Sequence, residues 1–84
     1  MLTPNNPTTG EALPIFPSLD ATKAKRIIGM AVTAAPLWAD TPIAERADAL
    51  RRVAKCLRDA KHELARLMAE EMGKPLREGL AEVE

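Results

Sequence analysis

Aromatic side chains are almost absent from this sequence. It has no tyrosine, one phenylalanine and one tryptophan, Phe16 and Trp38, in 84 residues. Aromatic rings supply much of the buried area of small cores, and a chain of this length buries only about 60% of the surface that its unfolded form exposes. Hydrophobic residues still make up 46% and charged residues 29%, which is typical of a globular chain. We therefore expect one folded unit with a thin core.

Other absences exclude classes of partner. Lys plus Arg equals Asp plus Glu, twelve of each, so no net field draws the chain to nucleic acid or to an anionic membrane. The longest uncharged run, residues 27–39, is shorter than the roughly 20 residues of a spanning helix. Residues 1–7 lack the features of a secretory signal, and a single cysteine, Cys56, suits a reducing compartment. These features predict a cytoplasmic protein with no nucleic-acid or membrane partner.

The first 17 residues are rich in proline, asparagine and glycine, a composition that excludes a helix. Asn6–Glu11 predicts a turn, and residues 12–16 predict a short strand. Pro14 and Pro17 would restrict that strand to a sheet edge, because proline cannot donate to a ladder. We therefore expect residues 1–17 to form a short extended β-hairpin segment.

Residues 18–84 repeat their apolar positions with the period of α-helices. Asp20 is placed to cap the first helix, which we expect to end between Pro36 and Trp38. Thr41 is expected to cap a second, unbroken helix, which Gly73 would end in the left-handed conformation. The apolar arc of this second helix consists of Ile43, Ala47, Leu50, Ala54, Leu57, Leu64 and Met68. The predicted three-helix portion therefore has the approximate bounds 20–38, 41–72 and 75–84, in a chain that is mostly α.

No motif predicts a catalytic, cofactor-binding or metal-binding residue. Cys56 and His62 are six positions apart on one predicted helix, which turns them about 120° from each other, so they cannot share a metal ion. We interpret Cys56 as a half-buried packing residue and His62 as a solvated one. Gly73-Lys74 lacks both the upstream glycine and the following Ser or Thr of a phosphate-binding loop, so it is interpreted as a helix end.

A basic cluster opens the first predicted helix, at Lys23, Lys25 and Arg26. No aromatic residue is interleaved with it, so a solvated face is favoured over a nucleic-acid patch. Acidic residues on the second helix also argue against a DNA-reading helix-turn-helix.

Three segments resemble the aldehyde dehydrogenase superfamily, in the same order and spacing: NPTTGE at 6–11, WADTPIAER at 38–46 and EMGKPL at 71–76, followed by EGLAEVE at 78–84. The combination of Phe16-Pro17-Ser18 with EMGKPL is most similar to succinate-semialdehyde dehydrogenases. The resemblance implies a fragment of a Rossmann-like α/β fold, namely the start of a truncated NAD(P)-binding domain. It also implies that the parent enzyme uses NAD or NADP and that this chain itself binds neither. The catalytic residues are expected later in the sequence of the parent enzyme.

Two basic residues are notable within this resemblance. Relatives usually have a small apolar residue where Lys61 falls, in the middle of the predicted apolar arc. Lys61→Ala is therefore expected to raise the helix content or the solubility of the chain. Arg46 belongs to the family pattern, and we expect its partner in the remainder of the parent enzyme.

Two functions remain open. The first is a truncated, catalytically inactive part of an NAD(P)-dependent aldehyde dehydrogenase, whose partner is the remainder of that enzyme. The alternative is a freestanding helical interaction module that pairs with a partner or with itself, as a homo-oligomer, through its exposed apolar faces.

Overall fold

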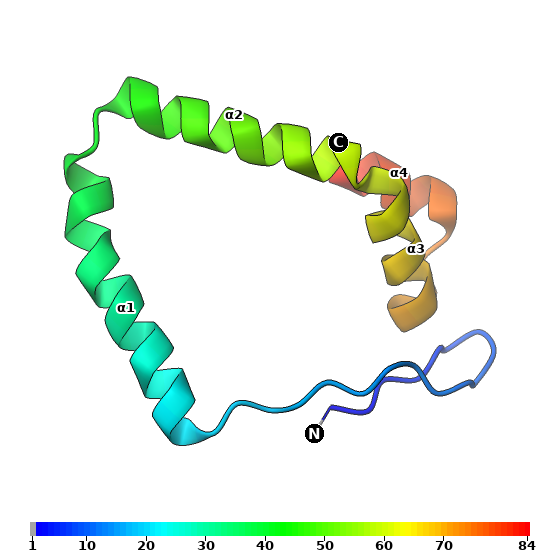
Figure 1. Cartoon of the computed structure of the whole chain (residues 1–84). Helices are drawn as coiled ribbons and strands as arrows, with labels where there is room; N and C mark the ends of the chain where they lie inside the picture. The colour runs from blue at the N-terminus through cyan, green and yellow to red at the C-terminus, as the bar shows by residue number, and fades with distance from the viewer. Residues whose placement is uncertain (1) are drawn as a thin grey trace.

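The computed structural model describes residues 2–84, which form four helices joined into an open frame (Figure 1). The N-terminal segment makes one side of the frame, α1 (Ala21–Asp40) and α2 (Ile43–Asp59) make the next two, and α3 (Lys61–Met72) with α4 (Leu76–Val83) closes the fourth. The predicted mostly helical fold is confirmed.

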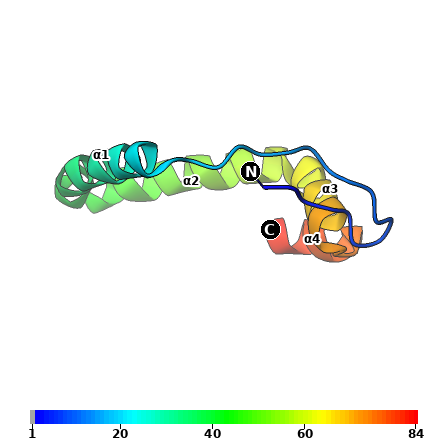
Figure 2. The same cartoon turned by 90° about the horizontal axis from the view of Figure 1, so that it is seen from below.

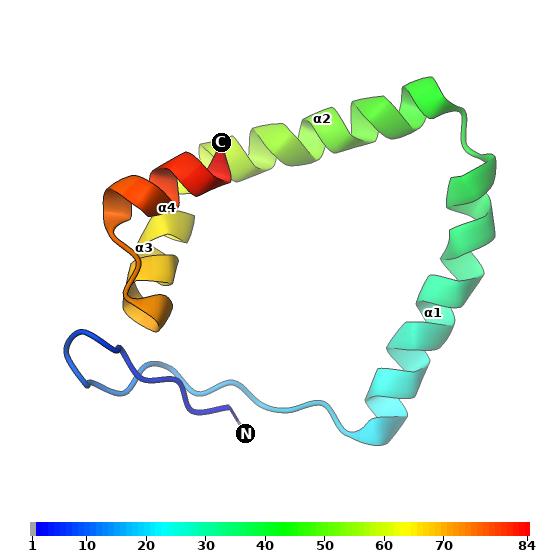
Figure 3. The same cartoon turned by 180° about the vertical axis from the view of Figure 1, so that it is seen from behind.

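The frame is flat. Its Cα trace measures 48 × 34 × 13 Å, and the view from below shows all four sides close to one plane (Figure 2). Seen from behind, α4 crosses α3 and ends beside the last turn of α2 (Figure 3). The only extensive contact between helices of the described chain joins α3 to α4. The core therefore sits at one end of the frame, and Ala65 is its one buried hydrophobic residue among positions 2–84.

The N-terminal segment folds back on itself without forming regular strands. Asn6 Oδ1 accepts hydrogen bonds from the amides of Thr8 and Thr9 at 2.9 and 3.3 Å, and Gly10 has a φ of 77°, so the predicted turn is present. Two isolated antiparallel bridges join its arms, Leu2 to Phe16 and Asn5 to Ala12. The strand expected over residues 12–16 is not formed, because prolines in both arms remove ladder donors.

The first helix begins as predicted and ends later. Asp20 accepts a hydrogen bond from the amide of Lys23 at 2.8 Å, which confirms its role as the N-cap. The expected end between Pro36 and Trp38 is too early, since α1 continues to Asp40 with the proline inside it. Thr41 stabilises this longer end, because its hydroxyl donates to the carbonyl of Leu37 at 2.8 Å.

This use of Thr41 corrects a second expectation. Its side chain closes α1, so α2 begins at Ile43 behind Pro42 with no side-chain cap. The proline lacks an N–H that would otherwise need an acceptor, and its fixed φ suits a helix start. Glu45 lies in the first turn and interacts favourably with the positive end of the helix dipole.

The helix expected over residues 41–72 is not continuous. It breaks at Ala60, where φ is −99° and ψ is 9°, and the chain turns sharply between α2 and α3 (Figure 1). The amide of Ala60 still donates to Cys56 and its carbonyl accepts from Leu64, so little hydrogen bonding is lost. The turn brings α3 against α4, and this tertiary contact decides a break that apolar periodicity does not predict.

The end of α3 is as predicted. Gly73 has a φ of 73° and its amide donates to Ala69 at 3.0 Å, a left-handed helix end that favours glycine. Pro75 immediately precedes α4, which begins at Leu76, one residue later than expected. No helix within residues 2–84 is long and apolar enough to cross a membrane.

Candidate functional site

The crossing of α3 and α4 is the best-packed part of the molecule. Ala65 is 1% exposed, and Gly79 is buried against it. A Cβ built on Gly79 would lie 3.1 Å from the Ala65 Cβ and 3.2 Å from its Cα. Two small residues therefore let the helix backbones approach closely, and this contact holds the α3–α4 end of the frame together.

Glu84, at the end of α4, is linked to the two helices on either side of the break at Ala60. Its carboxylate accepts from Arg58 Nε at 3.2 Å and from Lys61 Nζ at 3.4 Å. Lys61 therefore has a partner, and its expected position in an uninterrupted apolar arc is wrong because the helix breaks at the residue before it. Because Lys61 is paired with Glu84, Lys61→Ala is not expected to raise the helix content or the solubility of the chain.

The two cations lower the pKa of the Glu84 carboxyl, Arg58 contributing most. A depressed folded-state pKa means that this stabilisation is present above the unfolded pKa and is lost as pH falls through the folded value. We expect the Glu84 carboxyl to titrate below the ordinary range of glutamate in a carbon-detected NMR titration. Lys61→Ala should raise that pKa, whereas Arg66→Ala, which removes only the pair with Glu70, should leave it unchanged. Equal values in both variants would show that Lys61 is not paired with Glu84.

The connection between α3 and α4 is tied on two sides. Lys74 forms an ion pair with Glu82 of α4, and the left-handed Gly73 lies against the N-terminal segment, where its Cβ position is 3.2 Å from Pro7 Cγ. Gly73-Lys74 is thus a helix end, as interpreted from the sequence, and the structure adds the packing contact with Pro7. Pro7 and Gly73 close the frame.

Arg46 occupies the corner between α1 and α2. It is half-buried, and its Nε donates to the carbonyl of Thr41 at 3.0 Å. Within this chain its side chain therefore bonds a backbone group, and the expected partner in the remainder of the parent enzyme stays a prediction. The guanidinium satisfies a carbonyl that the turn leaves outside both helices.

The residues with nucleophilic or ligating side chains do not gather into a site. Cys56 is exposed, which corrects its expected half-burial, and His62 is exposed as predicted. Within residues 2–84 no three His, Cys, Asp or Glu side chains are grouped to hold a metal ion. The basic cluster at Lys23, Lys25 and Arg26 is exposed on α1, as a solvated face requires.

The described residues do not fit a nicotinamide dinucleotide. Such a cofactor is held by a glycine-rich turn between a strand and a helix. Gly29 and Gly79 lie inside helices, whereas Gly10 and Gly73 occupy separate turns. These four glycines therefore cannot form one phosphate-binding turn.

Comparison with known proteins identifies the family of this chain. The profile of the aldehyde dehydrogenase family matches residues 2–84. The chain belongs to the aldehyde dehydrogenase family. It is 40% identical over 79 residues to a glutarate-semialdehyde dehydrogenase of Pseudomonas aeruginosa, covering 94% of this chain and 16% of the relative.

Two further relatives share the semialdehyde theme. A succinate-semialdehyde dehydrogenase [NADP(+)] of Deinococcus radiodurans is 41% identical over 78 residues, or 93% of this chain and 16% of the relative. The Escherichia coli succinate semialdehyde dehydrogenase [NAD(P)+] Sad is 37% identical over 78 residues, or 93% and 17%. The chain therefore spans about one sixth of the length of these relatives. This match does not favour a freestanding interaction module.

Three residues that organise this segment are not predicted from the sequence. Ala65, Gly79 and Glu84 make the contacts that fix α3 and α4, and none of them was singled out from the sequence. One signal was available for Gly79. A glycine inside a helix costs about 1 kcal/mol relative to alanine, and its presence there indicates a packing reason. No comparable signal marks Ala65 or Glu84.

Proposed function

We propose that this chain is the N-terminal part of an NAD(P)-dependent aldehyde dehydrogenase that oxidises a carboxylate-bearing aldehyde, with succinate semialdehyde as the first substrate to test. The observation that carries this proposal is the alignment of 93–94% of the chain with about one sixth of the length of each of three semialdehyde dehydrogenases. The segment itself supplies scaffold, as the start of the NAD(P)-binding domain.

The chemistry supports this division. Aldehyde oxidation through a covalent intermediate needs a nucleophile, a base, oxyanion donors and a cofactor, all held together. Cys56 is exposed on α2, and no three His, Cys, Asp or Glu side chains gather in the described part of the chain. We therefore expect residues 1–84 alone to give no turnover of succinate semialdehyde with NAD or NADP above a heat-denatured control. Formation of reduced cofactor by the purified chain would contradict the scaffold role.

The substrate class must be tested on the longest polypeptide that the gene encoding these residues produces. We expect its kcat/KM for succinate or glutarate semialdehyde to exceed that for butanal, which lacks the distal carboxylate, by roughly tenfold to a hundredfold. This range corresponds to one charge-assisted hydrogen bond of about 1.5–3 kcal/mol. Reduced-cofactor absorbance measures all three rates. Equal values for butanal would contradict the proposed substrate class and leave the family assignment intact.

A further inference from the structure

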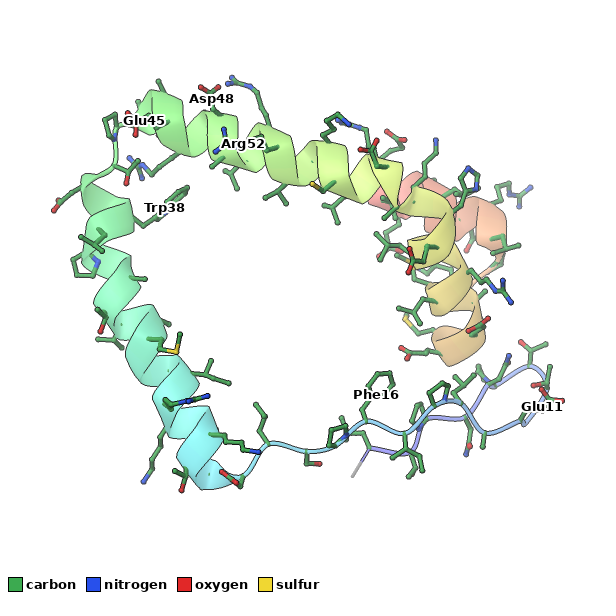
Figure 4. All side chains as sticks on the ribbon, in the orientation of Figure 1. Glu11, Phe16, Trp38, Glu45, Asp48 and Arg52 are labelled. Atoms are coloured by element: carbon green, nitrogen blue, oxygen red, sulfur yellow. The ribbon has the colours of Figure 1, made fainter. Side chains whose placement is uncertain are left out.

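A shallow groove runs along α1 on the side that faces away from the interior of the frame. Its volume is about 650 Å³, and it is lined by Arg26, Gly29, Met30, Thr33, Ala34 and Leu37. At about 100° per residue Gly29 lies opposite Trp38 on the helix, and Trp38 points into the frame (Figure 4). Within residues 2–84 the only extensive contact between helices joins α3 to α4, so no described helix packs into this groove.

Gly29 forms the floor of the groove. A glycine inside a helix costs about 1 kcal/mol relative to alanine, and its usual reason is close packing. Gly79 shows this reason within the chain, since its Cβ position is 3.1 Å from the Ala65 Cβ, whereas nothing in the described chain lies within 4 Å of the Cβ position of Gly29. Met30 and Leu37, which are 64% and 71% exposed, flank the open space. The groove therefore has room for an apolar side chain from outside the described chain.

This face of α1 is complementary to itself when two copies of the helix lie antiparallel. Arg26 and Asp40 are each seven positions from Thr33, and Gly29 and Leu37 are each four positions from it. All four lie within about 40° of Thr33 around the helix. A two-fold axis at Thr33 therefore brings Arg26 of each copy level with Asp40 of the other, and Leu37 of each copy level with Gly29 of the other. A two-fold interface requires this reciprocal pairing.

The charges on this face fit the antiparallel arrangement. No charged residue lies between positions 27 and 39, and the two ends of the face carry opposite charges, which is the pattern of an apolar interface centre with a polar rim. The ion pairs of residues 2–84 all lie between positions 48 and 84, so Arg26 and Asp40 have no ionic partner in the described chain. The Thr33 hydroxyl donates to the carbonyl of Gly29 at 3.1 Å, which satisfies the one polar side chain at the axis.

We propose that two copies of this chain bind each other through antiparallel α1 helices, with Leu37 of each copy seated over Gly29 of the other. The occupant of the groove is a second copy because the face supplies its own complement, in shape at Gly29 and in charge at Arg26 and Asp40. The contact lies on the side of α1 away from Trp38. It goes beyond the proposed function, since it requires neither substrate nor cofactor.

Disulfide cross-linking tests this pairing in the longest polypeptide that the gene encoding these residues produces. Helices that pack about 8–10 Å apart bring residues on the two-fold axis within reach of a disulfide. Thr33→Cys is therefore expected to give a covalent dimer on oxidation with diamide. Val32→Cys is the matched control, because that side chain is 67% exposed but lies about 100° away around α1. Both variants carry Cys56→Ala, which removes an exposed thiol, and non-reducing gel electrophoresis measures the dimer.

Charge reversal tests which residues face each other. In the Thr33→Cys background, Arg26→Glu and Asp40→Arg should each slow cross-linking by roughly tenfold, because each replaces two attractive contacts per dimer by two repulsive ones. The two substitutions together restore opposite charges and should restore the rate. Gly29→Leu should abolish cross-linking by filling the groove. Circular dichroism should show undiminished helix content for Gly29→Leu, since its Cβ position meets nothing within 4 Å and leucine favours helices.

Equal dimer yields from Thr33→Cys and Val32→Cys, including none from either, would overturn the proposal. A double charge variant that cross-links as slowly as the single ones would also overturn it, as would a rate that Gly29→Leu leaves unchanged. The charge variants decide the question even where Gly29→Leu lowers the helix content. None of these readouts uses turnover, so a failure of this proposal is distinguishable from a failure of the proposed function.

Discussion

Gly79→Leu is expected to separate α3 from α4 and to lower the free energy of unfolding by about 1–3 kcal/mol, the usual cost of overpacking. Even a methyl group at Gly79 meets Ala65 at 3.1–3.2 Å. The Cγ and the two methyl groups that follow in leucine have no space at this crossing. Leucine is a better helix former than glycine, so any loss is steric. Urea unfolding followed by circular dichroism measures the effect.

Gly29→Ala is the matched control for this prediction. Gly29 is also inside a helix, but its Cβ position meets nothing within 4 Å. Alanine should therefore stabilise α1 by up to about 1 kcal/mol through its helix propensity. If Gly79→Leu also stabilised the chain, the close crossing of α3 and α4 would be wrong.

Gly73→Ala is expected to have the second largest effect, because it combines two costs. At a φ of 73° a side chain costs roughly 1–2 kcal/mol, and the new Cβ would lie 3.2 Å from Pro7 Cγ. The N-terminal segment must then move away from the end of α3 and open the frame. Urea unfolding gives the free energy, and hydrogen exchange of the Leu2 and Phe16 amides, which pair across the segment, reports whether the segment loosens.

Gly10→Ala separates these two costs. Gly10 has a similar φ of 77°, but its Cβ position is in open space. Its substitution should therefore lose only the conformational part, so Gly73→Ala should be the more destabilising of the two. Equal losses would mean that the contact between Pro7 and Gly73 contributes nothing to stability.

The sequence predicts local structure correctly where a residue caps or ends the helix next to it. Asp20 caps α1 and Gly73 ends α3 as predicted, because a short carboxylate and a residue without Cβ have few alternatives at a helix end. Thr41 shows the limit of this reasoning. Its hydroxyl had two helix ends within reach, and it bonds back to Leu37 rather than forward into α2.

Composition, helix periods and the three short motifs of this chain determined that it is mostly helical and that it belongs to the aldehyde dehydrogenase family, because these properties are local or written directly in residue identity. The break at Ala60, the pairing of Lys61 with Glu84 and the close approach of Gly79 to Ala65 were decided by tertiary structure alone. The two contacts each join residues on either side of a turn of the chain. Lys61 and Glu84 are 23 positions apart, and Ala65 and Gly79 are 14 positions apart. A helical period remains the same whether the helix is straight or broken, so it carries no information about where a neighbouring helix makes the chain turn.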